Sequence, residues 1–407
     1  MHLDPIVNVL LGLSIVILAA KVGAVLANSF KQPLVLGELL AGVTLASFSL
    51  LGFNSFDFLK DNSTLEIFSS LGVIILLFEV GLESKLSEMM AVGIKSLLVA
   101  SVGVIMPFIL GYYVSGIIIQ DLPSISKIFI GATLTATSVG ITARVFKDLN
   151  FLANKEVKIV LGAAVIDDIF GLIILAVVSS VAVTGAIDFL SVSTISLKAI
   201  FFVILSVLAG LLLAKRSIKL IANHWNIPGM MLSLALLICF MGAYLANQFG
   251  LATIVGAFCT GLILDDLYFK NFYSSKTLEE YIQPISMFLV PIFFVVTGLN
   301  VDISVLGDPT VIYSSIALCL VAILSKLACG WAFPSKEKFN RILIGVGMIP
   351  RGEVGLIFAS VGKSIGVVDN RLYAIVVIVV ITTTVVTPPI LAFLINKLSK
   401  TGVNEQS

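Results

Sequence analysis

The sequence predicts an all-α polytopic membrane protein with about thirteen transmembrane helices, and three observations support this fold class. Of its 407 residues, 58% are hydrophobic and only 12% are charged, which is too apolar for a soluble protein. Many apolar runs approach the roughly 20 residues that a spanning helix needs. Basic residues also fall mainly in alternate loops. The net charge of +1 offers no electrostatic case for a nucleic-acid partner.

Apolar runs bounded by glycine, proline, asparagine and charge clusters define the predicted spans. The first run follows Met-His-Leu-Asp-Pro rather than a basic segment, so we expect a first span and not a cleaved signal. The four cysteines lie in apolar segments without metal spacing and predict no disulfide framework. The predicted spans are 6–27, 33–50, 64–83, 94–119, 126–147, 157–184, 195–214, 228–247, 251–266, 281–300, 310–333, 341–363 and 371–396.

The distribution of lysine and arginine predicts the orientation. If the odd-numbered loops are cytoplasmic, that side holds seventeen basic residues and the other side holds five. Such an imbalance sets topology by the positive-inside rule. We therefore expect the N-terminus outside and a short cytoplasmic tail over 397–407, in a prokaryotic cell (inner) membrane. Trp225 and Trp331 fall at the predicted inner interface, where amphipathic rings prefer to lie.

The most informative stretch is LGAAVIDDIFGLIIL, which places Asp167 and Asp168 in the middle of an apolar run. Lys158 lies ten residues before Asp168, or ~15 Å along a helix, about half of a ~30 Å hydrocarbon core. An acid at that depth costs at least ~2.5 kcal/mol, and such residues usually line an ion or proton path. The alternative is a structural pair neutralised by protonation and hydrogen bonds.

Three other spans bring polar groups to the same depth. Lys326 lies ten residues before Lys336, and Arg351 lies ten residues after Arg341. Thr137 lies ten residues before Lys147. Four spans therefore deliver polar side chains to one plane of the membrane.

Two of these spans are predicted to be interrupted. Weak helix formers cluster in the fifth span, and glycines and a proline cluster in the twelfth. Unwound backbone in a membrane is tolerated where it lines a cavity, and its carbonyls then serve as ion ligands. The alternatives are ordinary helix packing for the hydroxyls and a simple kink for the glycine and proline cluster. The two clusters are Thr133, Thr135, Thr137, Ser138 and Gly140, and Gly345, Gly347, Pro350 and Gly352.

The positions of the interruptions predict inverted repeats. Spans four to six and eleven to thirteen are seven spans apart, and an odd offset inverts the topology of the second set. Inverted repeats with interrupted helices crossing at the midplane are typical of secondary transporters.

Six stretches of the chain closely resemble the sodium/proton antiporters of the cation/proton antiporter superfamily, specifically its NapA-like branch. They are KQPLVLGELLAG, LLFEVGLE, ATSVGITARVFKDL, LGAAVIDDIFGLI, PIFFVVTGL and GMIPRGEVGLIFA. The resemblance implies a homodimer that exchanges cytoplasmic Na⁺, often also Li⁺, for protons. It also implies dimerisation or scaffold spans at 1–93 and 185–309, an ion-binding core at 94–184 and 310–396, and the tail at 397–407.

Carried onto this sequence, the resemblance assigns roles within the site. Asp168 matches the carboxylate that binds both the cation and the proton, and Asp167 matches the acid paired with Lys326. Asp168 and Asp167 would together bind the transported Na⁺. Thr137 and Ser138 match the unwound crossing segment. The resemblance implies no cofactor.

Three further intramembrane acids receive separate interpretations. Glu353 cannot share a regular helix face with Arg351 but could pair with it across an unwound turn, and we favour such a structural pair over direct transport. Glu38 is expected to be hydrogen-bonded within the bundle, with a functional role as the alternative. Glu79 departs from the family pattern, which is apolar there, and it would alter the inferred cation selectivity if it faces the site.

The predicted function is therefore secondary active Na⁺/H⁺ antiport by alternating access, with K⁺/H⁺ antiport as the alternative. A transporter-fold sensor and a cation channel are more remote alternatives. The chain concentrates both signs of charge at one level of one subunit, whereas a channel needs rings of charge or carbonyls. A membrane enzyme is not expected, because no nucleophile, base or metal set is visible at depth. Lys326 is either a second proton carrier, which makes exchange electrogenic, or a structural residue.

Overall fold

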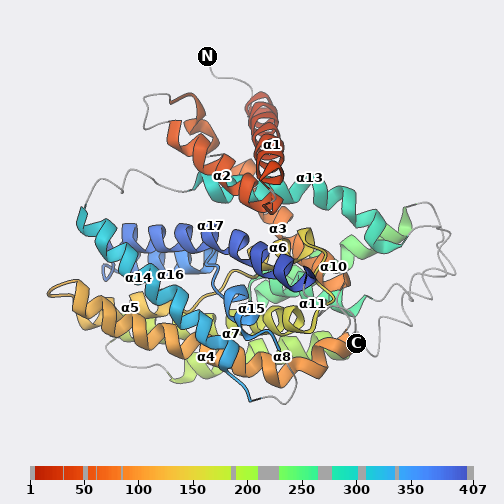
Figure 1. Ribbon diagram of the computed structural model, residues 1–407. Coiled ribbons are helices and arrows are strands. Elements are labelled where there is room, and N and C mark those ends of the chain that lie inside the picture. The colour runs from red at the N-terminus through yellow and green to blue at the C-terminus, as the bar shows by residue number, and fades with distance from the viewer. Residues whose placement is uncertain are drawn as a thin grey trace.

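The computed structural model describes residues 5–30, 32–48, 54–60, 62–83, 86–184, 189–209, 229–264, 277–300, 309–334 and 339–400. Within these ranges every regular element is a helix, as the sequence predicts (Figure 1). In chain order the helices are α1 (Pro5–Ser29), α2 (Leu34–Ser47), η2 (Asn54–Leu59), α3 (Ser63–Glu83), α4 (Leu86–Ile118), α5 (Ser124–Thr133), α6 (Val139–Asp148), α7 (Lys155–Thr184), α8 (Phe189–Ala209), α10 (Met230–Gln248), α11 (Thr253–Ile263), α13 (Leu278–Leu299), α14 (Pro309–Leu327), η5 (Ala328–Trp331), α15 (Arg341–Gly347), α16 (Glu353–Ser364) and α17 (Asn370–Lys400).

Each of the thirteen predicted spans has a helical counterpart among the described residues, and the fifth and twelfth spans are each split into two half-helices. In the part of the chain that the structure describes, seven helices are long and apolar enough to cross a membrane individually. They are α1, α3, α4, α10, α13, α14 and α17, and α2 and α11 are shorter apolar helices. The chain is therefore an integral, multi-pass membrane protein.

Several helix boundaries differ from the predicted spans. The structure begins α4 at Leu86 and not at residue 94, and it extends α17 to Lys400. Span prediction follows apolar runs, whereas a helix continues past the hydrocarbon core wherever its backbone stays hydrogen-bonded. Lys95, one residue inside the predicted span 94–119, lies within α4 with its Nζ 4.5 Å from the centroid of the Phe339 ring.

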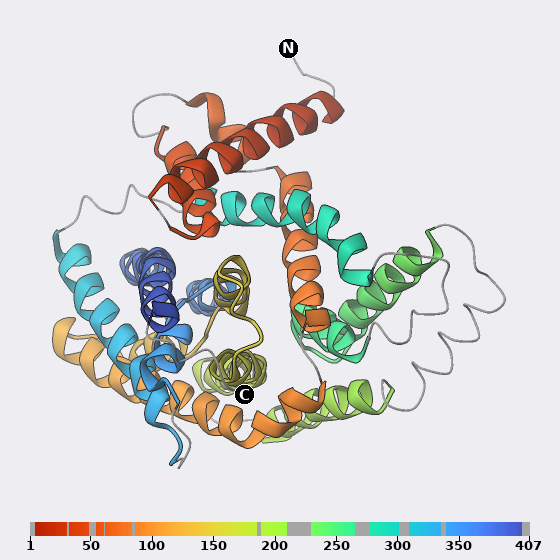
Figure 2. The ribbon, with the colours of Figure 1, turned by 45° about the vertical axis from the view of Figure 1, so that its right-hand side comes forward.

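The helices pack in two groups. The N-terminal bundle contains α1, α2, α3, α10, α11 and α13, and the crossing bundle contains α4 to α7 and α14 to α17. Helix α8 contacts α7 on one side and α11 on the other, and so joins the two (Figure 2). Direct contact between the bundles is made by α6 with α2 and α3, and by α17 with α2. Helix α6 is thus the main element of the crossing bundle that faces the N-terminal bundle.

Close approach of helices within the N-terminal bundle depends on glycine. A Cβ atom at Gly42 of α2 would overlap the Val295 carbonyl oxygen of α13, and one at Gly298 would overlap the Leu39 carbonyl oxygen. Small residues are the usual means by which membrane helices bring their backbones together. The α2–α13 contact is therefore fixed by backbone proximity and tolerates no added side chain.

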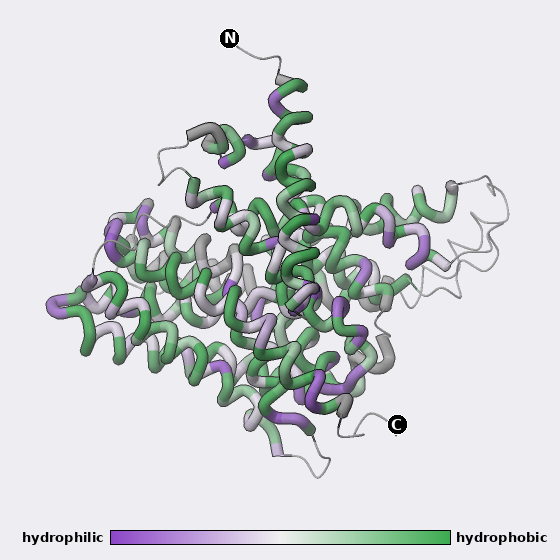
Figure 3. Tube along the Cα trace, turned by 45° about the horizontal axis from the view of Figure 1, so that its top comes forward, coloured by the Kyte–Doolittle hydropathy of each residue, from purple (hydrophilic) through white to green (hydrophobic). Residues whose placement is uncertain are grey.

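Hydrophobic residues occupy most of the length of the helices, and hydrophilic residues are concentrated at several helix ends and loops (Figure 3). Large hydrophobic residues such as Ile94, Ile117 and Leu18 are well exposed, as expected for side chains that face lipid. The four cysteines, Cys239, Cys259, Cys319 and Cys329, are buried and unbonded, as predicted. The buried polar groups of the crossing bundle include Asp167, Asp168, Lys326 and Arg351.

Candidate ion-binding site

Two interrupted helices meet at the centre of the crossing bundle. Helix α5 ends at Thr133 and α6 begins at Val139, which leaves residues 134–138 without regular structure. Helix α15 ends at Gly347 and α16 begins at Glu353, which leaves residues 348–352 in the same condition. The interruptions predicted from the two residue clusters are therefore confirmed. Two half-helix N-termini and two C-termini, with their opposite partial charges, converge on one point.

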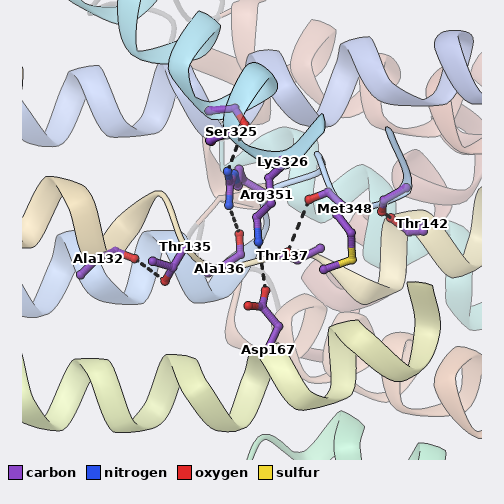
Figure 4. Close-up of polar contacts among 12 residues, drawn as sticks. Ala132, Thr135, Ala136, Thr137, Thr142, Asp167, Ser325, Lys326, Met348 and Arg351 are labelled. Carbon is purple, nitrogen blue, oxygen red and sulfur yellow. Dashed lines mark hydrogen bonds and ion pairs between the residues drawn. The ribbon is translucent and has the colours of Figure 1, made fainter. Parts of the chain in front are cut away.

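Hydrogen bonds join the two unwound segments directly (Figure 4). The Ser138 backbone amide donates to the Pro350 carbonyl at 2.8 Å. The Thr137 Oγ1 hydroxyl donates to the Met348 carbonyl at 3.4 Å. Backbone groups released from a membrane helix must find internal partners, because the surrounding lipid offers none. Each interruption therefore supplies partners for the other.

A further hydrogen bond lies beside the crossing. The Thr142 Oγ1 hydroxyl, in the first turn of α6, donates to the Gly347 carbonyl at 2.8 Å. Gly347 is the last residue of α15, so its carbonyl lacks an intrahelical donor. The hydroxyl satisfies that carbonyl and ties α6 to α15. The sequence analysis did not single out Thr142, although its placement one helical turn after Ser138 was a usable signal.

Arg351 serves as an internal clamp for this arrangement. It is 1% exposed, and its NH1 donates to the Ala136 carbonyl at 2.6 Å. Its NH2 donates to the Ala322 carbonyl of α14 at 3.4 Å, and its own carbonyl accepts a hydrogen bond from Thr384 of α17. The guanidinium thus connects the unwound segment of the fifth span to α14. The predicted pairing of Arg351 with Glu353 concerns a side chain that lies outside the described residues.

Lys326 and Asp167 form a buried ion pair next to the crossing. Lys326 Nζ lies 3.4 Å from Asp167 Oδ2, and the two residues are 0% and 2% exposed. Figure 4 shows the ammonium of Lys326 reaching from α14 toward the carboxylate on α7. Space for the ammonium is left by Gly103 of α4, where a Cβ would lie 3.2 Å from Nζ. The sequence placed these two charges at one depth, and the structure brings them into contact.

Further oxygen atoms suited to a hard monovalent cation are carried by α7 and by the unwound segment at residues 134–138. Asp168 follows Asp167 in α7 and is 6% exposed. Asp167 Oδ1 and Ser138 Oγ are buried and have no hydrogen-bond partner, while Thr137 contributes a second hydroxyl nearby. Buried polar atoms are normally satisfied, so orphaned oxygens beside a carboxylate pair indicate a place for a cation. The arrangement can bind a small cation or a proton.

Glu38 and Glu79 do not join this site. Both are buried in the N-terminal bundle, Glu38 on α2 and Glu79 on α3. Glu38 Oε1 lies 3.6 Å from Arg144 NH2, and Glu79 Oε1 lies 2.8 Å from Lys147 Nζ. Sequence reasoning counted both basic partners, at the end of the predicted span 126–147, among the basic residues of the cytoplasmic side and missed these contacts. The i,i+4 spacing of Arg144 and Asp148, which form a 2.8 Å ion pair, indicated that this segment is helical.

A cavity of about 110 Å³ lies between the bundles and reaches the crossing at Arg351 and Gly352. Its remaining lining comes from α2, α13 and α17, and includes Val43, Thr297 and Val380. Thr297 is two residues before the end of α13, and Val43 is four residues before the end of α2. Glu38 is the fifth residue of α2 and Glu79 lies four residues before the end of α3, where both acids contact the second half of α6. The interface is therefore hollow at one end and ion-paired at the other.

Comparison with known proteins identifies relatives over almost the full chain. The family described as "Sodium/hydrogen exchanger, transmembrane" matches residues 14–397. The high-affinity Na⁺/H⁺ antiporter NhaS3 of Synechocystis is 38% identical, over 98% of this chain and 92% of its own length. The Na⁺/H⁺-K⁺ antiporter GerN of Bacillus cereus is 33% identical, over 95% of this chain and 96% of its own. Among solved structures, the sodium proton antiporter MjNhaP1 of Methanocaldococcus jannaschii has a TM-score of 0.70 at 18% identity, with both chains fully covered.

Proposed function

The chain belongs to the transmembrane sodium/hydrogen exchanger family of the cation/proton antiporter superfamily, and we propose that it exchanges Na⁺, and also Li⁺, for protons. The observation that carries the proposal is the buried Asp167 and Asp168 pair beside two crossing half-helices, with Lys326 in contact. Such a site can release a proton when it takes up a cation, which is the elementary step of antiport.

The proposed roles follow the chemistry of each group. Asp168 alternates between a proton and the transported cation, and Asp167 pairs with Lys326 when the cation is absent. Ser138 and Thr137 contribute hydroxyl oxygens to the cation. The charged supports are Arg351, which holds the crossing together through two carbonyls, and Glu353 at the start of α16.

Alternating access is proposed to arise from movement of the crossing bundle against the N-terminal bundle. The cavity at one end of their interface and the ion pairs at the other support such a rigid-body motion. The positive-inside imbalance supports an external N-terminus and a cytoplasmic C-terminus in a prokaryotic cell membrane. We further propose a homodimer joined through the N-terminal bundle, with pH homeostasis as the physiological role.

A second candidate function is K⁺/H⁺ exchange. It is favoured by one observation, the 33% identity to an antiporter whose name includes K⁺ beside Na⁺. The two candidates share the site and the mechanism and differ only in cation size.

Transport by purified protein in vesicles tests both candidates. With a pH-sensitive dye inside proteoliposomes, external Na⁺ or Li⁺ should make the interior more alkaline, because each cation that enters drives protons out. A matching response to K⁺ would establish the second candidate. Cation uptake without proton movement would indicate a channel, and no movement of either in correctly inserted protein would indicate a sensor. Protein-free vesicles provide the background.

We expect Gly352→Ala to weaken the apparent affinity for Na⁺ about tenfold or more, because small displacements at a binding site have large effects. A Cβ at Gly352 would lie 2.7 Å from Ser138 Oγ and 2.8 Å from Ser138 Cβ, so Ser138 must move. Gly355→Ala is the matched control, since its Cβ would be no closer than 3.4 Å to Val380. Half-saturation by Na⁺ in the vesicle assay measures both. Equal affinity in the two variants would contradict a role for Ser138.

A further inference from the structure

Two acidic residues of the N-terminal bundle contact basic residues of the crossing bundle, and the site described above does not use them. Glu79 of α3 is 0% exposed, and its Oε1 lies 2.8 Å from Lys147 Nζ at the end of α6. Its other oxygen, Oε2, accepts a hydrogen bond from Ser286 Oγ of α13 at 2.5 Å. Glu79 is thereby fixed in place by its own bundle, and Lys147 is its partner from the other.

The second contact is built in the same way. Glu38 of α2 is 1% exposed, and Arg144 NH2 lies 3.6 Å from its Oε1. Arg144 is also held by Asp148, at 2.8 Å, four residues along α6. In each pair the carboxylate belongs to the N-terminal bundle and the cation to the last turns of α6. A displacement of α6 along α2 and α3 that exceeds the reach of these side chains therefore separates both pairs.

These ion pairs lie at one end of the interface between the bundles. Helix α6 begins at Val139, beside the crossing, and Arg144 and Lys147 follow five and eight residues later. At ~1.5 Å per residue, the pairs lie about 8–12 Å from the crossing along α6. Between them and the crossing, the interface is apolar and closely packed. A Cβ at Gly140 would lie 3.4 Å from Val73 Cγ2, and Leu77 beside it is 1% exposed.

The opposite end of the same interface is hollow. The cavity that reaches Arg351 and Gly352 opens between α2, α13 and α17, toward the last residues of α2 and α13. The interface thus contains a cavity toward one end and is closed at the other by apolar packing and two ion pairs. Under the orientation proposed above, the closed end is the cytoplasmic one, because α6 ends there.

We propose that Glu79–Lys147 and Glu38–Arg144 form a double latch that closes the cytoplasmic side of the site and opens when the crossing bundle moves. The proposal rests on the exchange function and alternating access described above, and it adds the residues that govern access from one side. Separating a buried carboxylate from its cation is unfavourable until water enters, so the latch favours the closed arrangement. It breaks when the cytoplasmic side becomes hydrated.

Accessibility of a cysteine introduced behind the latch tests the proposal. Leu77→Cys places a thiol in the closed part of the interface, and its reaction with a membrane-impermeant maleimide reports opening on that side. The four native cysteines are buried, so the parent chain gives the background rate. We expect Glu79→Gln or Lys147→Gln, added to Leu77→Cys, to increase the labelling rate about fivefold or more, a typical effect of uncoupling two groups in contact.

Two controls separate the latch from a general loss of packing. Glu66→Gln makes the same chemical change on an exposed residue of α3 and should leave labelling unchanged. The charge exchange of Glu79→Lys with Lys147→Glu should return labelling to the slow rate. Equal labelling in Glu79→Gln, Lys147→Gln and Glu66→Gln would overturn the latch, and so would a charge exchange that stays fast.

Cation-driven proton movement, measured in the same vesicles, distinguishes failure of the latch from failure of the proposed function. If cation-driven proton movement is observed but the labelling rate does not change with the latch substitutions, the latch is refuted and the antiport function stands. Labelling that responds as expected in protein without cation-driven proton movement would refute the function and leave the latch intact.

Discussion

Replacing Asp168 with asparagine should abolish cation exchange while leaving the protein folded and inserted. Asparagine preserves the volume of the side chain, but its amide can neither carry a proton nor neutralise a desolvated cation. Asp168 lies in the middle of α7 and is 6% exposed, so no water-filled surface could replace its charge. We expect Na⁺-driven proton movement in vesicles to fall to the level of protein-free vesicles.

The matched control for this variant is Asp369→Asn. Asp369 is exposed, and its Oδ1 accepts the Leu372 amide at 2.8 Å at the start of α17. Asparagine caps helices as well as aspartate does, so this variant should transport normally. If both variants elute from a sizing column as the parent protein does and show the same thermal unfolding profile, misfolding is excluded. Full exchange activity in Asp168→Asn would invalidate the assignment of the site.

Replacing Lys326 with glutamine should remove charge movement from the transport cycle and leave electroneutral exchange. Binding of Na⁺ draws Asp167 toward the cation, and Lys326, whose Nζ lies 3.4 Å from Asp167 Oδ2 in the structure, is left without its counter-charge. A buried unpaired ammonium is costly, so it releases its proton. Two protons, one from Asp168 and one from Lys326, then leave for each Na⁺. Without the lysine only one proton leaves, and the current disappears.

Current on a solid-supported membrane, recorded with Na⁺ flux, measures this change. Flux that survives while current is lost supports Lys326 as a proton carrier. Unchanged charge per Na⁺ would return Lys326 to a structural role. Removing one partner of a buried ion pair also destabilises a protein by about 3–5 kcal/mol. The double variant Asp167→Asn with Lys326→Gln removes both charges and should recover most of the lost thermal stability, which separates the structural effect from the electrical one.

Sequence patterns predicted the elements of the crossing but not the contacts that join them. Weak helix formers around Thr137 and the glycines around Pro350 predicted two interruptions, because these residues lower the stability of a continuous helix. The hydrogen bond from the Ser138 amide to the Pro350 carbonyl could not be predicted, because backbone groups are the same in almost every residue type. Inverted repeats place the two segments at the same depth, and only the packed structure fixes which atoms meet.

The partners of the outlying acids were missed for a different reason. Arg144 and Lys147 were counted among the cytoplasmic basic residues that set orientation, and a basic residue near a helix end usually lies in water. Their side chains instead face α2 and α3, where 11% and 21% of their surfaces stay exposed. The sequence places Glu79 and Lys147 on separate helices. The helical periodicity of each segment does not show which neighbouring helix the side chain faces. Long-range side-chain pairing is therefore the part of the site that required a structure.

The crossing also constrains the order in which the protein can be assembled. Thr137 and its acceptor Met348 are 211 residues apart in the chain. At about 5–20 residues per second, a ribosome needs about 10–40 s to synthesise the second segment after the first. During that interval the backbone of residues 134–138 has no partner from the twelfth span, in a setting where lipid supplies none. The fifth span therefore reaches its final structure only after the twelfth span has been synthesised. Until then, its unwound segment needs hydrogen-bond partners from water or from the insertion machinery. A chain that stops before α15 lacks the Pro350 carbonyl that accepts the Ser138 amide and the Met348 carbonyl that accepts the Thr137 hydroxyl.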